Sequence, residues 1–156
     1  MDNRGLGTTV ICQVGLIVRD IERSSEAYSR VFGLPRPEVI VTDGPEIAHT
    51  QFRGQPTDAR AKLAFFDMGQ VSLELIEPIG GPSTWREFLD ERGEGVHHIA
   101  FTVEGTDEVV AFLAGAGIGV VQQGDYTGGR YTYVDSAPAL GVILELLENF
   151  GSEPEG

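Results

Sequence analysis

The pattern of hydrophobic and polar residues predicts a chain built mainly of strands, with three amphipathic helices. Strand-like segments alternate apolar residues with small or polar ones, whereas helical segments repeat apolar residues every three or four positions. The predicted strands cover residues 9–18, 39–41, 48–52, 61–66, 70–76, 96–103, 119–123, 130–134 and 141–147. The predicted helices cover residues 21–32, 84–91 and 107–115.

Local signals mark the ends of two of these helices. Asp20 is a candidate N-cap of the first helix, and Gly33 ends it because Pro35 prevents the helix from resuming. Thr84 and Glu87 have the spacing of a capping box at the start of the second helix. Aromatic residues at helical spacing usually pack inside, so we expect the neighbouring Trp85 to lie in the core.

Two phrases of the sequence occur twice. Gln13-Val-Gly-Leu-Ile-Val18 matches His98-Ile-Ala-Phe-Thr-Val103 position for position. Ser72-Leu-Glu-Leu-Ile-Glu77 matches Ile143-Leu-Glu-Leu-Leu-Glu148 in the same way. In each half the first phrase is a strand followed by a helix and three more strands, with the second phrase last. The repeat therefore indicates that one βαβββ unit is duplicated.

We predict an α+β fold in which the two βαβββ units share one core. The length of 156 residues fits one compact domain, which we place at residues 1–156. Within it, the first module covers residues 9–79, the second covers 95–149, and a linker helix at 83–92 joins them. Residues 1–8 are expected to be a loose lead-in and 151–156 a disordered tail.

Composition and charge narrow the range of partners. Eleven basic residues against 24 acidic ones give a formal net charge of −13, which disfavours nucleic acid and anionic membranes. The single cysteine, Cys12, excludes an intramolecular disulfide framework and is expected to be a buried thiol. We find no signal peptide and no apolar run long enough to span a membrane, so a cytoplasmic location is expected.

The strand after Gly93 and Gly95 carries the first candidate for chemistry. Strict alternation would place Val96, His98, Ala100 and Thr102 on one face, which is small and polar. His97 would then lie on the opposite, apolar face and have a structural role. On the small-residue face, His98 has room beside it for a ligand.

The repeat brings three more residues into this hypothesis. It pairs Gln13 with His98 and Glu74 with Glu145, and all four stand in strands with apolar neighbours. Carboxylates on a buried face are costly unless they are paired or bound to metal. Four such residues at equivalent positions of a duplicated fold predict one shared metal site. Glu77 and Glu148, at the ends of the same strands, are expected to be solvated.

These motifs resemble the vicinal oxygen chelate superfamily, which includes glyoxalases, bleomycin resistance proteins and dioxygenases. The pieces that carry the resemblance are Gly93-x-Gly-x-His-His-Ile-Ala, Leu73-Glu-Leu-Ile-Glu-Pro78 and Gly141-Val-Ile-Leu-Glu145, and the region from Trp85 to Phe101 looks most like methylmalonyl-CoA epimerases. The resemblance implies a half-barrel cup with a divalent metal held by His98, Glu145 and Glu74. It also implies a homodimer.

Three positions depart from the families' patterns. The epimerases have histidine where this chain has Gln13, and the resulting Gln/Glu/His/Glu set resembles that of zinc-type glyoxalase I, the lactoylglutathione lyases. Those lyases hold glutathione with arginines at two positions that are Ile17 and Glu94 here. The epimerases take a glutamate base from a strand position that aligns with Lys62. Both enzyme families therefore stay open as alternatives.

The leading functional hypothesis is a metal-dependent isomerase or epimerase that moves a proton α to a carbonyl. Three oxygen donors and one imidazole suit zinc, cobalt, nickel or manganese, and either Glu145 or Glu74 could act as the base on a carbonyl or thioester substrate. The alternatives are a lactoylglutathione lyase and a metal-free binding or resistance protein. A ring-cleaving dioxygenase needs a site with two histidines and one carboxylate, and only one candidate histidine is present.

Four further residues are candidates for contact with the substrate. Arg130, Tyr131 and Tyr133 follow a pair of glycines in a strand of the second module, with the two tyrosines on one face and the arginine on the other. Lys62 lies in the corresponding stretch of the first module and could meet an acidic group. Either face of the strand could line the cup.

Overall fold

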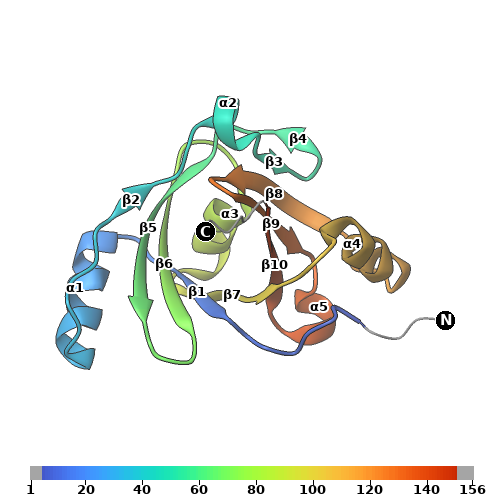
Figure 1. Ribbon diagram of the computed structural model, residues 1–156. Coiled ribbons are helices and arrows are strands. Elements are labelled where there is room, and N and C mark those ends of the chain that lie inside the picture. Colours follow the sequence, from blue (N-terminus) through green and yellow to red (C-terminus); the bar gives the residue numbers. More distant parts are fainter. Residues whose placement is uncertain (1–4, 151–156) are drawn as a thin grey trace.

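A single ten-stranded sheet curls around a central cup (Figure 1). The computed structural model describes residues 5–150. The strands are β1 (Gln13–Ile17), β2 (Ile40–Val41), β3 (Gln51–Phe52), β4 (Gln55–Pro56), β5 (Arg60–Asp67), β6 (Ser72–Ile79), β7 (Gly95–Thr102), β8 (Val120–Tyr126), β9 (Gly129–Val134) and β10 (Ile143–Asn149). Their order across the sheet is β2-β5-β6-β1-β7-β10-β9-β8-β3-β4.

The order of the strands shows the predicted duplication. In each module the last strand lies parallel to the first, so β6 pairs with β1 and β10 pairs with β7. The two modules meet where β1 runs antiparallel to β7 at the centre of the sheet. The predicted fold class, two βαβββ modules forming a half-barrel, is therefore confirmed.

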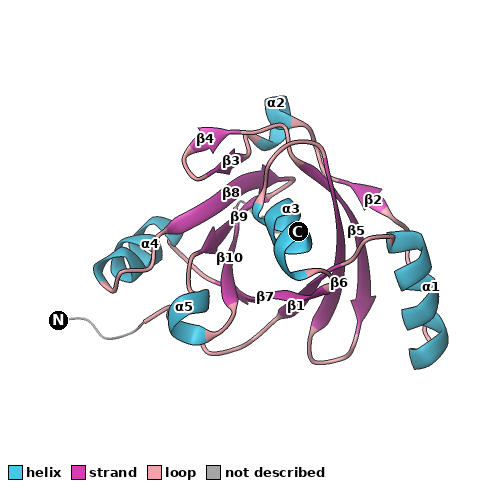
Figure 2. Ribbon diagram, turned by 180° about the vertical axis from the view of Figure 1, so that it is seen from behind, coloured by secondary structure: helices cyan, strands magenta, loops and turns pink. Residues whose placement is uncertain are grey.

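Five helices accompany the sheet: α1 (Ile21–Phe32), α2 (Pro45–Ala48), α3 (Thr84–Arg92), α4 (Thr106–Gly115) and α5 (Ala137–Leu140). Figure 2 shows α1 and α4 outside the sheet on opposite sides of the molecule, with α3 between the two modules. The helix α1 has the predicted bounds, and its N-cap is Asp20, which accepts a hydrogen bond from the backbone N–H of Arg23. It packs on β5 and β6 through the buried Ile21, whereas its predicted contacts Val31 and Phe32 are exposed.

Two prolines account for the largest departures from the predicted elements. Residues 48–52 were expected to be a strand, but Pro45 begins the short helix α2, and only residues 51–52 pair as β3. The residues expected as a loop at 54–58 include β4. Pro138 similarly begins α5, so the last strand starts at Ile143 and not at residue 141.

The hairpin of β3 and β4, residues 51–56, crosses from the first module to the second. Gln51 and Phe52 of β3 lie opposite Gln123 and Gln122 of β8, while β4 forms the outer edge of the sheet. This arm closes one side of the cup above the strands (Figure 1).

Glu77 and Glu148 do not have the solvated role expected from the sequence. The backbone N–H of Ile21, at the start of α1, donates to Glu77 Oε1 at 2.9 Å. At the start of α4, Gly105 and Thr106 donate to the two oxygens of Glu148 at 3.3 and 3.0 Å. Each glutamate thus satisfies free N–H groups of its own module's helix, where a negative charge is also favoured by the helix dipole.

Three buried clusters form the core, and Trp85 lies in one of them as predicted. Cys12 lies just before β1 and is only half-buried, so the expectation of a fully buried thiol is wrong. Its sulfur lies 3.4 Å from the carbonyl oxygen of Ala100. The expected tail at 151–156 lies outside the described residues.

Candidate metal centre

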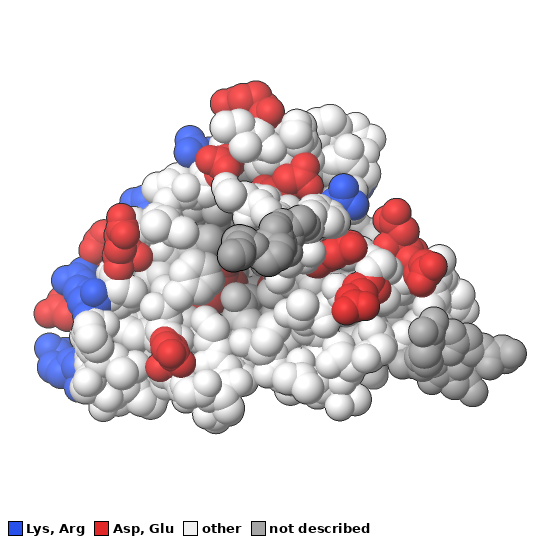
Figure 3. Space-filling view, in the orientation of Figure 1, with Lys and Arg blue, Asp and Glu red and all other residues white. Residues whose placement is uncertain are grey.

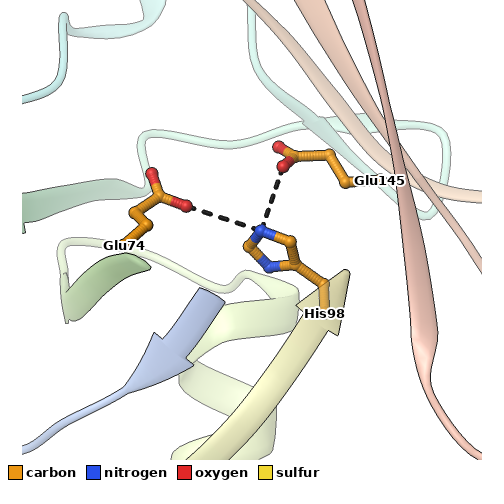
Figure 4. Close-up of side chains that lie close together, drawn as sticks. All are labelled: Glu74, His98 and Glu145. Carbon is orange, nitrogen blue, oxygen red and sulfur yellow. Dashed lines mark ion pairs between the residues drawn. The ribbon is translucent and has the colours of Figure 1, made fainter. Parts of the chain in front are cut away.

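Four side chains from four adjacent strands meet at the floor of the cup. His98 Nε2 lies 3.0 Å from Glu145 Oε1 and 3.5 Å from Glu74 Oε1 (Figure 4). One terminal atom of the Gln13 amide lies 3.0 Å from His98 Nε2, 3.1 Å from Glu74 Oε1 and 3.0 Å from Glu145 Oε1. The structure therefore brings together all four residues that the repeat singled out, two from each module.

The spacing of these four atoms suits a divalent ion. Bonds of about 2.1 Å from one ion to nitrogen and oxygen donors place neighbouring donors about 3.0–3.4 Å apart. The distances given above lie close to that range, and Glu74, His98 and Glu145 form a cluster that could hold a metal. Three oxygen donors and one imidazole are the set that zinc, cobalt, nickel or manganese accepts. The residues present thus fit the metal that the fold family implies.

Gly15 makes room for the ring of His98. The two residues face each other across the β1–β7 seam, and a Cβ at Gly15 would lie 2.0 Å from Cε1 of His98. Real Cβ atoms essentially never approach another heavy atom so closely. The sequence analysis did not single out Gly15, although it is the small residue two positions after Gln13 and therefore on the same face of β1.

The predicted opposite orientation of His97 and His98 is wrong. The pairing of β1 with β7 shifts between Gly15 and Leu16, so that His97 has no partner residue on β1. This β-bulge breaks the strict alternation of side chains. The two imidazole rings lie 5.2 Å apart, their Nδ1 atoms are 2.9 Å apart, and Val96 is exposed on the surface.

His97 connects the site to helix α3. Its Nε2 lies 3.2 Å from the hydroxyl oxygen of Thr84. Burial, followed by the nearby His98, holds the pKa of His97 well below its ordinary value, so its ring is neutral. A neutral His97 can accept the Nδ1–H of His98 and donate its own Nε2–H to Thr84, which leaves Nε2 of His98 as the lone pair that faces the site.

The charges of the site call for a cation. Burial alone would lower the pKa of His98, but Glu145 and Glu74 outweigh it and raise that pKa to about 10. Burial also raises the pKa of Glu74, and the neighbouring Glu145 adds to this effect. The metal-free floor therefore holds an imidazolium between two carboxylates, at the place where a divalent ion would bring its charge.

A cavity of about 490 Å³ opens above this floor. Tyr131 and Tyr133 line it, as one of the two predicted orientations of their strand requires. Arg130 and Lys62 do not: Arg130 pairs with Asp125 at 3.4 Å, and Lys62 Nζ lies 3.9 Å from Glu77. Both therefore leave the set of candidate substrate contacts. Among residues 5–150, no helix is long and apolar enough to cross a membrane.

Comparison with known proteins identifies the family of the chain. A model of the Glyoxalase/Bleomycin resistance protein/Dioxygenase superfamily matches residues 12–134. The matched segment is well over half of the sequence and includes three of the four residues on the floor. The chain therefore belongs to this superfamily.

Individual relatives within the superfamily include epimerases. The uncharacterized protein YqjC of Bacillus subtilis is 29% identical over 146 residues, covering 90% of this chain and 92% of that protein. A 2-epi-5-epi-valiolone epimerase of an Actinomyces species is 28% identical, covering 94% and 84%. A solved methylmalonyl-CoA epimerase in complex with methylmalonyl-CoA and NH4+ is 27% identical with a TM-score of 0.63, covering 93% and 97%.

Proposed function

We propose that this protein is a divalent-metal-dependent epimerase that removes and returns a proton α to a carbonyl group. The observation that carries the proposal is the position of the two glutamates. Glu74 comes from β6 in the first module and Glu145 from β10 in the second, so they approach His98 from opposite walls of the cup (Figure 4). A planar intermediate between these walls would present one face to each carboxylate.

This arrangement suits a reaction that inverts a carbon centre. Glu145 takes the α-proton, the electron pair of the broken C–H bond moves to the carbonyl oxygen, and the substrate becomes an enolate. Glu74 returns a proton to the opposite face, so that atoms and charge balance over the cycle. A divalent ion bound at the floor would supply positive charge that stabilises the negative charge developing on the substrate oxygen.

The other residues of the site hold these groups in place. Gln13 and His98 lie between the carboxylates and would hold the metal, and neither is a suitable base because one is not basic and the other gives its lone pair to the ion. His97 fixes the ring of His98. The apolar walls of the cup exclude water, which strengthens the interactions between the charges inside.

The lactoylglutathione lyase remains the second enzyme candidate because the Gln/Glu/His/Glu set resembles that of those enzymes. The two positions that carry glutathione-binding arginines in those enzymes do not supply cations here. Ile17 is fully buried, and Glu94 accepts a hydrogen bond from the backbone N–H of Arg19 at 2.8 Å. The epimerase is therefore the better-supported proposal. The homodimer that the family resemblance implies stays a prediction, which light scattering of the purified protein would test.

Deuterium uptake tests the proposed reaction. The metal-loaded protein is incubated in heavy water with methylmalonyl-CoA, with smaller 2-substituted thioesters and with α-hydroxyketones, and label in the substrate is followed by mass spectrometry. Glu145→Gln and Glu74→Gln should each slow exchange by roughly 100-fold or more, the usual contribution of a general base, while the exposed control Glu104→Gln exchanges like wild type. His98→Ala should lose the metal. Absence of exchange into every compound by metal-loaded wild type would refute the proposal.

A further inference from the structure

The cavity above the metal floor has a lining that says which substrate it suits. Apolar side chains form much of its wall, with hydroxyl groups between them, as is usual for pockets that bind small molecules. The lining residues are Gln13, Ile40, Val41, Thr42, Asp43, Ala48, Thr50, Leu63, Phe65, Glu74, Ile76, Trp85, Asp125, Tyr126, Thr127, Tyr131, Tyr133, Glu145 and Leu147. The charged members of this set are four carboxylates, and neither lysine nor arginine occurs in it.

The basic residues near the opening are already engaged. Arg130 pairs with Asp125 at 3.4 Å, and Asp125 also lies 2.9 Å from Nδ1 of His49. Arg53 donates to both oxygens of Glu87 at 2.7 and 2.8 Å. Arg60 donates to the carbonyl oxygen of Thr42 at 2.8 Å. These arginines therefore have little to offer to the phosphate groups of a large ligand.

The surface around the opening has the same character. Figure 3 shows acidic side chains above and to the right of the central hollow, whereas most of the basic ones on this face lie at its left edge. The chain as a whole carries a formal net charge of −13. Like charges placed together cost binding energy and slow encounter, so this face disfavours a ligand that carries several phosphates.

Hydroxyl groups on one wall of the cavity are set to bind polar oxygens. The hydroxyl of Tyr133 accepts a hydrogen bond from Trp85 Nε1 at 3.0 Å, and that of Tyr131 accepts one from Gln122 Nε2 at 3.1 Å. Each phenol keeps its own proton for an acceptor, because a hydroxyl can accept and donate at once. The rings of Trp85 and Tyr131 lie 6.0 Å apart and form a continuous aromatic surface beside these hydroxyls.

We infer that the cup binds a compact, uncharged, polyhydroxylated ketone and not an acyl-CoA. This inference rests on the proposed function, and it names the class of substrate for that same site. The hydroxyl and carboxylate groups of the lining would bind the hydroxyls of such a ketone, and the aromatic surface would contact its carbon skeleton. The cavity volume of about 490 Å³ holds a molecule of this size without any part of it reaching the acidic opening.

The test compares three probes with the metal-loaded protein in heavy water: a pentahydroxycyclohexanone, methylmalonyl-CoA, and methylmalonyl-pantetheine, which keeps the thioester and lacks the phosphates. The hydroxyketone should exchange with a kcat/KM at least about tenfold above that of the CoA thioester, and the pantetheine thioester should exchange faster than the CoA thioester. Exchange into methylmalonyl-CoA as fast as into the hydroxyketone would overturn this inference and leave the epimerase standing. Exchange into none of the three would overturn both.

A pair of variants tests the electrostatic reason. Asp125→Asn removes one carboxylate from the opening and releases Arg130, so the rate for methylmalonyl-CoA relative to methylmalonyl-pantetheine should rise several-fold. Asp107→Asn removes one negative charge from the exposed surface of α4 and should leave that ratio at the wild-type value. If both variants give the wild-type ratio, the acidic opening does not select the substrate.

Discussion

Replacing Gly15 with alanine should disrupt the metal site without touching any of the four candidate ligands. The new methyl group would lie 2.0 Å from Cε1 of His98 and 2.5 Å from both of its ring nitrogens. Ordinary contact begins at 3.4 Å, so the ring or the strand must move by about 1.4 Å. His98 has no exposed surface and its Nδ1 lies 2.9 Å from that of His97, so the ring has little free space to enter.

The size of this displacement sets the expected effect. Ligand positions in a metal site have a tolerance of about 0.2 Å, so a shift of this size should weaken binding by at least roughly 100-fold. Overpacking of a buried site should also lower the free energy of unfolding by about 1–3 kcal/mol. Gly119→Ala is the matched control, because its Cβ would meet nothing within 4 Å.

Metal affinity by competition with a chelating dye, and denaturant unfolding of the metal-free forms, would measure both effects. The double variant Gly15→Ala/His98→Ala shows whether the clash is the cause. Without the ring, the added methyl group should cost less stability than it costs in wild type, which appears as a coupling between the two sites. Wild-type metal affinity in Gly15→Ala, or an equal cost with and without the ring, would refute the reasoning.

Three further predictions concern the surroundings of the site. Metal binding should release a proton from His98, whose pKa of about 10 in the metal-free site keeps it protonated at pH 7, so affinity should rise by up to about tenfold per pH unit and calorimetry in buffers of different ionisation enthalpy should detect the proton. Because this pKa lies above the ordinary 6.5, its contribution to the stability of the metal-free protein is complete below about pH 6.5 and is lost as pH rises towards 10; a midpoint of thermal unfolding that stays constant over this range would contradict the assignment. His97→Phe should keep the packing but weaken metal binding by about 10- to 100-fold, and unchanged affinity would show that His97 does not orient the ligand. Glu148→Ala should lower the free energy of unfolding by about 1 kcal/mol, as lost helix caps do. Hydrogen bonds from Thr106 hold the pKa of Glu148 below its ordinary value, so the cap contributes above that ordinary value and is lost as pH falls through the depressed pKa, and an equal loss at pH 2 and pH 7 in denaturant unfolding would contradict it.

The sequence predicted the convergence at the floor because a duplicated unit carries its own geometry. Gln13 and His98 stand at equivalent positions of the two central strands, and Glu74 and Glu145 at equivalent positions of the strands beside them. Once both units join the same sheet along β1 and β7, these four positions must lie close together. No property of any single residue would have been sufficient.

Other features depend on interactions that local patterns do not record. Alternation assumes that each residue has one partner across the sheet, and the bulge at His97 breaks that assumption. The role of Gly15 follows from the size of a ring 83 positions away in the sequence. Glu77 and Glu148 cap helices because the last strand of each module ends beside the start of that module's helix, which requires the parallel pairing to be known.

The arm of β3 and β4 has a consequence for the order in which the chain folds. Hairpin strands such as β5 and β6 can pair as soon as they are made, whereas β3 waits for β8, whose Gln122 lies 70 residues after its partner Phe52. At about 5–20 residues per second, a ribosome takes several seconds to make that distance. During this interval the first module presents an unpaired strand edge, which is the kind of surface that holding chaperones protect. The arm should therefore dock late and complete the wall of the cup after the metal floor has formed.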